Sequence, residues 1–109
     1  MGHPTSLDRV MDERRAERNT AVTKLVLDVL KPHQPTLIEF ARSLTSTRGV
    51  ERVNASVMEV DAETETIKLI IEGRDLDVEE ISETVRRLGG VVHSVDEVIV
   101  EVRRVERRG

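Results

Sequence analysis

Residues 66–102 read TIKLIIEGRDLDVEEISETVRRLGGVVHSVDEVIVEV, and their pattern changes from strand to helix and back to strand. The first part alternates apolar with other side chains, as a half-buried β-strand does. The middle part carries one apolar stripe at helical spacing, made of Val78, Ile81, Val85 and Leu88. The last part is rich in valine, which favours strands. The stretch therefore predicts strand 66–73, a helix, and strand 91–102.

Capping signals mark both ends of this helix. Asp77 and Glu80 have the spacing of an N-cap residue and the third residue of a helix. Gly89 and Gly90 follow the apolar stripe, and glycine readily adopts the left-handed conformation that ends many helices. We expect the helix to begin just after Asp77 and to end at the glycine pair.

The preceding half of the chain shows the same order of elements. The segment VTKLVLDVL (22–30) predicts a buried strand, which the prolines of KPHQP (31–35) end. A second helix follows, because Thr36 and Glu39 form a capping box ahead of apolar residues at helical spacing. Arg48-Gly49 is the expected end of this helix.

The segment VERVNASVMEVD (50–61) alternates apolar and polar residues and predicts a half-buried strand. The turn AETE (62–65) then returns the chain into strand 66–73 as a hairpin. The complete order is β-α-β-β-α-β. Right-handed crossovers place both helices on one face of a four-stranded antiparallel sheet. This α+β arrangement is the ferredoxin-like architecture, with the first and third strands central and the second and fourth at the edges.

The other face of this sheet has no predicted cover. Alternation along the first strand puts Val26, Asp28 and Leu30 on this open face if Leu25 and its alternate neighbours face the helices. Together with Ile70, the apolar members make a patch of the kind that usually marks an interface. Unpaired edge strands also invite pairing with another chain. We therefore expect a homo-oligomer that assembles through sheet edges and the open face.

Length and composition limit the class of protein. A chain of 109 residues fits one domain. No apolar run approaches the ~20 residues that span a membrane, and the N-terminus lacks the apolar core of a secretion signal. There is no cysteine, which excludes disulfides and thiol chemistry. We expect a cytoplasmic protein without a membrane partner.

Charge is distributed unevenly and suggests three segments. A charged N-terminal arm (1–20) precedes the ferredoxin-like domain (21–102), and a basic C-terminal tail (103–109) follows it. Residues 22–102 contain 9 Lys and Arg against 16 Asp and Glu. Phosphate binding needs clustered cations, so this acidic body predicts no nucleic-acid partner.

Common catalytic signatures are absent from the sequence. It has no glycine-rich phosphate loop, no nucleophile elbow and no His-Glu-x-x-His pair. RNA-recognition modules share the predicted fold but stack bases on sheet aromatics, and the single aromatic residue, Phe40, lies in a helix stripe. Metallochaperones of this fold use paired cysteines. The sequence therefore predicts a protein that is not an enzyme.

Two histidines and three carboxylates are the candidates for a ligand site. His33 follows the first strand and His93 begins the fourth, and these strands are antiparallel neighbours in the predicted fold. Both histidines could therefore share one rim of the sheet, with Asp96 or Glu97 nearby. Asp28 interrupts a central strand and needs a partner, such as Lys68 or a neighbouring subunit. The alternative is that both histidines only brace the fold.

A divalent metal ion is the cofactor that these residues suggest. Imidazole and carboxylate ligands suit transition metals, so His33, His93 and Asp96 form one candidate set. Asp61 and Glu63, in the acidic hairpin turn EVDAETET, form a second set that could hold a hard cation such as calcium. The turn lacks the spacing of an EF-hand, and a solvated acidic turn is the alternative.

The last strand changes phase in its middle. Val91 and Val95 have one parity, whereas the valines from Val98 onward have the other. A β-bulge at Asp96-Glu97 would produce this change and would also redirect the side chain of Asp96.

Four segments together resemble a known family. They are LVLDVLKPHQP, RGVERVNASVMEVDAETETIKLIIEG, DLDVEEI and GGVVHSVDEV, and they cover about residues 22–101. In this order they resemble the archaeal family known as domain of unknown function 211. The resemblance implies a ferredoxin-like fold, a ring-like homo-oligomer and an archaeal, cytoplasmic origin. It implies no established activity.

We interpret the sequence as a homo-oligomeric binding or scaffolding module with an unidentified protein or small ligand as its further partner. A ligand- or metal-sensing regulatory ring is the alternative. A metal-dependent enzyme with a site between subunits is a third reading, which the missing catalytic motifs disfavour.

Overall fold

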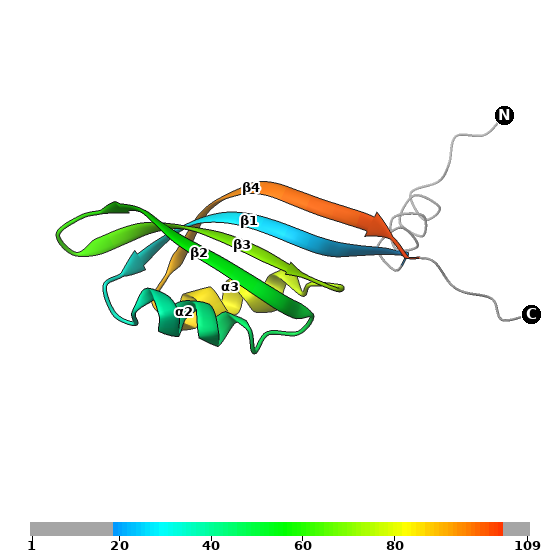
Figure 1. Ribbon diagram of the computed structural model, residues 1–109, viewed down its shortest axis with the longest axis horizontal. Helices are drawn as coiled ribbons and strands as arrows, with labels where there is room; N and C mark the ends of the chain where they lie inside the picture. The colour runs from blue at the N-terminus through cyan, green and yellow to red at the C-terminus, as the bar shows by residue number, and fades with distance from the viewer. Residues whose placement is uncertain (1–18, 104–109) are drawn as a thin grey trace, which may run out of the picture.

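The computed structural model describes residues 19–103. The N-terminal arm (1–20) and the basic tail (103–109) that the sequence predicts lie almost entirely outside these residues. The six elements follow the predicted order (Figure 1): β1 (Thr20–Pro32), α2 (Leu37–Leu44), β2 (Val50–Val60), β3 (Thr64–Gly73), α3 (Val78–Arg87) and β4 (Val91–Val102). The fold is therefore ferredoxin-like α+β, as the sequence predicts.

The four strands form one antiparallel sheet in the order β2-β3-β1-β4. The predicted central and edge strands are confirmed. Both helices cover the same face of the sheet, and β1 and β4 extend together beyond the helices (Figure 1). This arrangement leaves the opposite face of the sheet open and part of β4 without a helix over it.

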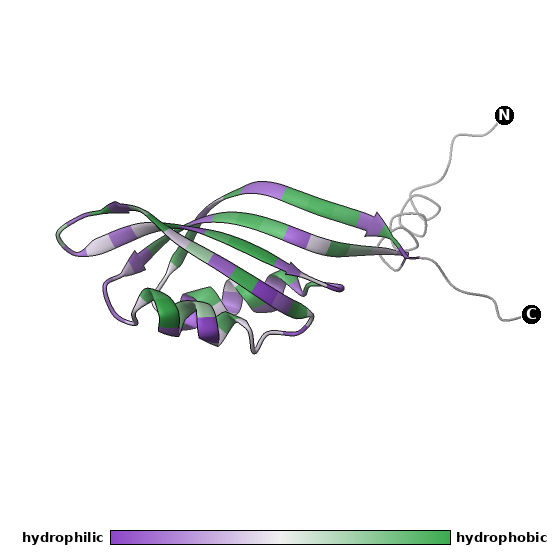
Figure 2. Cartoon of the chain, in the orientation of Figure 1, coloured by the Kyte–Doolittle hydropathy of each residue, from purple (hydrophilic) through white to green (hydrophobic). Residues whose placement is uncertain are grey.

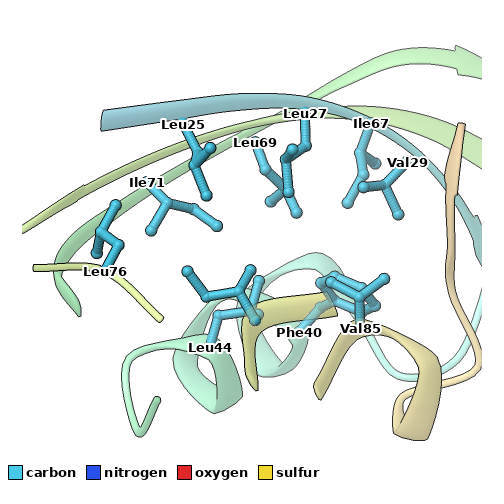
Figure 3. Close-up of a cluster of buried hydrophobic side chains, with 11 residues drawn as sticks. Leu25, Leu27, Val29, Phe40, Leu44, Ile67, Leu69, Ile71, Leu76 and Val85 are labelled. Carbon is cyan, nitrogen blue, oxygen red and sulfur yellow. The ribbon is translucent and has the colours of Figure 1, made fainter. Parts of the chain in front are cut away.

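The hydrophobic core lies between the sheet and the two helices (Figure 3). Leu25, Leu27 and Val29 of β1 point into it, as alternation along the strand predicts. β3 contributes its own alternate residues, and the helices contribute one apolar stripe each. The complete set of core residues is Leu25, Leu27, Val29, Phe40, Leu44, Ile67, Leu69, Ile71, Leu76, Ile81 and Val85.

Helix α2 begins as predicted but ends earlier. The hydroxyl of Thr36 accepts a hydrogen bond from the Glu39 backbone N–H, and the Glu39 carboxylate accepts one from Thr36 N–H, which confirms the capping box. The prediction that Arg48-Gly49 ends the helix is wrong, because the helix stops at Leu44. The hydroxyls of Thr45 and Thr47 donate to backbone carbonyls of the last turn, and such local bonds compete with helix continuation.

Helix α3 matches its predicted capping signals. The side chain of Asp77 accepts a hydrogen bond of 3.0 Å from the Glu80 backbone N–H. Gly89 has φ +85°, the left-handed conformation expected after the helix. The Gly90 N–H then donates to the carbonyl of Val85.

The β2–β3 turn is shorter than predicted. Asp61 N–H donates to the carbonyl of Thr64, so the chain reverses over residues 61–64. Glu65, which is predicted to lie in the turn, lies in β3 opposite Val60 and Lys31. The side chain of Glu65 therefore belongs to the sheet and faces β1.

The predicted irregularity in β4 is confirmed. Val26 pairs with Glu97 and Leu27 pairs with Val95, so Asp96 is an extra residue, as in a β-bulge. A second shift in the same strand leaves His93 as an extra residue. The other edge strand has a shift of the same kind at Met58.

The open face is less apolar than predicted. Leu30 is exposed, whereas Ile70 is half-buried and only 6% of Val26 is accessible. Val26 lies among charged side chains that rise from the neighbouring strands. The three residues therefore do not form the continuous apolar patch that the sequence analysis expected.

Gly73 is a position where the fold leaves no room for a side chain. A methyl group at Gly73 would overlap the carbonyl oxygen of Gly49, where β2 and β3 meet. We predict that Gly73→Ala lowers the free energy of unfolding by roughly 2–4 kcal/mol, measured by urea denaturation. Gly89→Ala should cost only about 1–2 kcal/mol, because its added methyl meets only Pro32 and the penalty is the left-handed φ. Equal losses in the two variants would contradict this ranking.

Candidate functional site

A hollow of about 550 Å³ lies on the open face of the sheet, between its two edges. All four strands contribute to its wall. Its lining combines five charged side chains with three apolar ones. The lining residues are Lys24, Val26, Asp28, Met58, Thr66, Lys68, Ile70, Asp96 and Glu97.

Two register shifts flank this open-face hollow. The extra residue of β2, Met58, lies on one side, and the extra residue of β4, Asp96, lies on the other. A bulge bends its strand and redirects a side chain, and bulges are common beside functional sites. The two irregular edges therefore aim Met58 and Asp96 into the hollow.

Three of the charged groups in the hollow make polar contacts within the chain. Lys24 Nζ lies 2.7 Å from a carboxylate oxygen of Glu97, and this hydrogen bond raises the pKa of Lys24 above its ordinary value. The hydroxyl of Ser94 donates to Asp96 Oδ1 at 2.8 Å. These contacts hold Glu97 and Asp96 at the β4 side of the hollow.

Lys68 and Asp28 lie opposite each other on β3 and β1. From the sequence, Lys68 is one potential partner for Asp28. Within residues 19–103, however, neither side chain makes a hydrogen bond or an ion pair. The two central strands therefore present an unpaired ammonium group and an unpaired carboxylate, side by side, to the hollow.

His93 lines a second, smaller hollow of about 340 Å³ on the same face. Asp28, Leu30, Glu59 and Thr66 complete its lining, and Asp28 and Thr66 also belong to the larger hollow. His93 therefore lies near Asp28, which is another residue of the predicted ligand site.

His33 is held elsewhere. Its Nε2 lies 3.0 Å from the carbonyl oxygen of Ala62, and its Nδ1 lies 3.7 Å from the Glu65 carboxylate. Both contacts are with the β2–β3 hairpin, since β1 runs past the start of β4 and its last residues pair with β3 alone. Throughout the described chain, no three His, Asp or Glu side chains lie together in a group that could hold a metal ion. The structure therefore does not assemble His33, His93 and Asp96 into one cluster.

The second candidate metal set, which lies in the acidic turn, is not assembled into a metal site either. Asp61 and Glu63 are exposed at the tip of the β2–β3 hairpin. Within residues 19–103, they belong to no group of three or more side chains that could hold a metal ion. The calcium proposal for Asp61 and Glu63 therefore has no support from the geometry of one chain.

A buried lysine forms the best-satisfied polar cluster of the described chain. Lys31 is fully buried, and its Nζ contacts the carbonyl oxygens of Pro32 and His33 and, at 2.9 Å, the Glu65 carboxylate. Three acceptors satisfy the three donors of an ammonium group. This Lys31–Glu65 lock joins the end of β1 to the β2–β3 hairpin. The hydrogen bond from Lys31 is the main cause of a lowered pKa for Glu65.

The edge strand β4 exposes a row of valines that we call the valine edge: Val95, Val98 and Val100, which are 56%, 50% and 53% accessible. Val95 and Val98 pair with Leu27 and Leu25, so they point to the helix side of the sheet. No helix covers them there, and Figure 2 shows the hydrophobic colour along this part of β4.

The opposite edge of the sheet carries an apolar groove of about 410 Å³ between α2 and β2. Its lining, which we call the α2–β2 groove, consists of Leu37, Ile38, Ala41, Arg42, Thr45, Val53 and Ala55. Ile38 is 67% accessible and is the most exposed apolar residue of this groove. Both free edges of the sheet are therefore apolar on the same, helix-bearing side.

Comparison with known proteins identifies the family. The family model DUF211, described as an uncharacterised ArCR family, matches residues 23–109. The chain belongs to the DUF211 family. The resemblance found in the sequence is confirmed.

The DUF211 chain is also similar to the uncharacterized protein MJ0319 of the archaeon Methanocaldococcus jannaschii. The two are 45% identical over 85 residues, which are 78% of this chain and 88% of the relative. Neither helix of the described DUF211 domain is long and apolar enough to cross a membrane.

Two of these features, the buried Lys31 and the valine edge, are not among the predictions from the sequence. Lys31 continues the inward row of Leu25, Leu27 and Val29, so strict alternation along β1 would have predicted a buried lysine and the need for a carboxylate partner. The exposure of the valine edge had no such signal, because it depends on where α3 ends relative to β4.

The Lys31–Glu65 lock predicts a pH dependence of stability. Because the folded protein holds the pKa of Glu65 below its ordinary value of 4.5, the unfolded chain binds a proton more readily. The lock therefore contributes fully to the free energy of unfolding above pH 4.5. This contribution is lost as the pH falls through the pKa of Glu65 in the folded protein. Urea denaturation over a pH series should show wild type losing its advantage over Glu65→Gln in this acidic range. Glu63→Gln, in the exposed turn, is the control and should follow wild type. A constant difference between wild type and Glu65→Gln at all pH values would contradict the lock.

Proposed function

We propose that this DUF211 protein is a self-assembling binding or scaffolding module rather than an enzyme. In this proposal, β4 of one copy pairs with β2 of the next copy. The observation that carries it is the valine edge, an apolar row on an unpaired strand. Long apolar edge strands template the addition of another chain unless the protein covers them.

The order of the strands supports head-to-tail addition. Strand directions alternate through β2-β3-β1-β4, so β4 and β2 run in opposite directions. A second copy placed beside the first in the same orientation would continue the sheet as an antiparallel pair. The helices of both copies would then cover the same side, and repeated addition with a constant rotation closes into a ring.

The two apolar edges complement each other in this arrangement. The valine edge and the α2–β2 groove both lie on the helix side of the sheet, so β4 of one copy would bring Val95 and Val98 next to Ile38 and Val53 of the next. Burying a half-exposed valine contributes about 1 kcal/mol. Three valines fall short of the ~4–15 kcal/mol lost on association, so the proposal also requires the groove and the backbone hydrogen bonds of the new strand pair.

The alternative, a ligand-sensing regulatory ring, is supported by the open-face hollow. Head-to-tail addition along the edges would leave this face accessible, so assembly and ligand binding are compatible. The proposal includes no nucleic-acid partner, because residues 22–102 are predominantly acidic and phosphate binding needs clustered cations.

Light scattering coupled to size exclusion tests the assembly. Wild type should be a multimer at micromolar concentration, and Val98→Lys should dissociate it, because a lysine at the centre of the valine edge would be buried without a partner. Ile38→Lys, in the α2–β2 groove, should dissociate it as well. Leu30→Lys is the control, because Leu30 is exposed on the open face away from both edges. A monomeric wild type would refute the proposal.

Mixing the two assembly-deficient variants distinguishes head-to-tail addition from a symmetric dimer. Val98→Lys retains an intact α2–β2 groove, and Ile38→Lys retains an intact valine edge. Their mixture should therefore form a heterodimer and nothing larger. A symmetric β4–β4 dimer would instead survive in Ile38→Lys alone, which would exclude head-to-tail addition.

A further inference from the structure

The open-face hollow contains charges that neither folding nor the proposed assembly explains. Asp28 lies on a central strand, where β-propensity disfavours aspartate, and it is half-buried without a partner among residues 19–103. Lys68, directly opposite, is also unpaired within this part of the chain. Both residues face away from the core and from the two sheet edges.

The balance of charges restricts what could bind there. The hollow is lined by three carboxylates and two ammonium groups, and one of each, Glu97 and Lys24, is already paired. The groups that remain are Asp28 and Asp96 on one side and Lys68 on the other. A metal ion would meet the repulsion of two lysines, and a simple anion would meet an excess of carboxylates. A molecule with both charges suits the hollow better than either.

We infer that the open-face hollow binds a small organic zwitterion, whose carboxylate contacts Lys68 and whose ammonium group contacts Asp28 and Asp96. Lys68, Asp28 and Asp96 lie on the adjacent strands β3, β1 and β4, so positive and negative groups follow one another across the sheet. Strands are separated by about 4.8 Å, so a molecule the size of an amino acid can reach from one strand to the next.

The remaining lining provides an apolar floor and a cover. Val26 and Ile70 lie between the charged residues on the two central strands, and Met58 reaches in from β2. Methionine adapts its shape to different apolar groups. The volume of about 550 Å³ is within the range of about 300–1,000 Å³ typical of small-molecule sites. The apolar part of the zwitterion would lie on this floor.

Amide-resolved NMR titration of the full chain tests the site. The probes are γ-aminobutyrate and L-leucine, with butylamine and butyrate as matched molecules that carry one charge each. The zwitterions should shift the backbone amides of Val26, Lys68 and Ile70 at millimolar concentration, and the single-charge molecules should not. Lys68→Met and Asp28→Asn should each weaken binding by roughly tenfold, the loss expected for one charge-assisted contact.

Glu83→Gln, on the exposed surface of α3, is the control and should bind as wild type does. The spectra themselves show whether each variant remains folded. Absence of shifts with both zwitterions, equal shifts with butylamine or butyrate, or unchanged binding in the Lys68 and Asp28 variants would overturn the inference. The titration repeated on Val98→Lys separates this site from assembly, because the hollow is formed by one chain and binding should persist whatever the size of that variant.

Discussion

The inward row of β1 is the constraint on which the rest of the structure depends. Leu25, Leu27 and Val29 must face the helices, because no other face of the sheet is covered. Alternation then fixes the outward row, Lys24, Val26, Asp28 and Leu30, on the open face. The same alternation carries Lys31 into the interior, where the Glu65 carboxylate and two backbone carbonyls satisfy it. One periodicity thus determines the core, the lock and the wall of the hollow.

The edges of the sheet depart from this regularity, and both departures have consequences. The extra residues Asp96 in β4 and Met58 in β2 break the register with the central strands. Each enters the hollow on the open face. On the helix side, the same strand β4 carries valines beyond the cover of α3. Strand β4 therefore contributes to two surfaces, the polar hollow on the open face and the apolar valine edge on the helix side.

Membership in DUF211 places these surfaces in a family without an assigned activity. The proposed functions rest on different residues, since the valine edge and the α2–β2 groove lie on the helix side and the zwitterion site lies on the open face. They can therefore be separated by substitution. A ring with an accessible charged hollow in each subunit would combine the scaffolding and ligand-sensing readings of the sequence.

By itself, the sequence determined the order of elements, the strand pairing, both N-caps and the bulge at Asp96, because alternation, helical spacing and capping are local signals. It misplaced the end of α2 and the β2–β3 turn, because threonine hydroxyls and a single hydrogen bond at Asp61 decide those boundaries. Only the tertiary structure separated His33 from His93, because the last residues of β1 pair with the β2–β3 hairpin and not with β4. Only the tertiary structure shows that Asp28 and Lys68 are unpaired among residues 19–103 and that no helix covers Val95, because helix position and side-chain direction result from packing and cannot be derived from the spacing of residues.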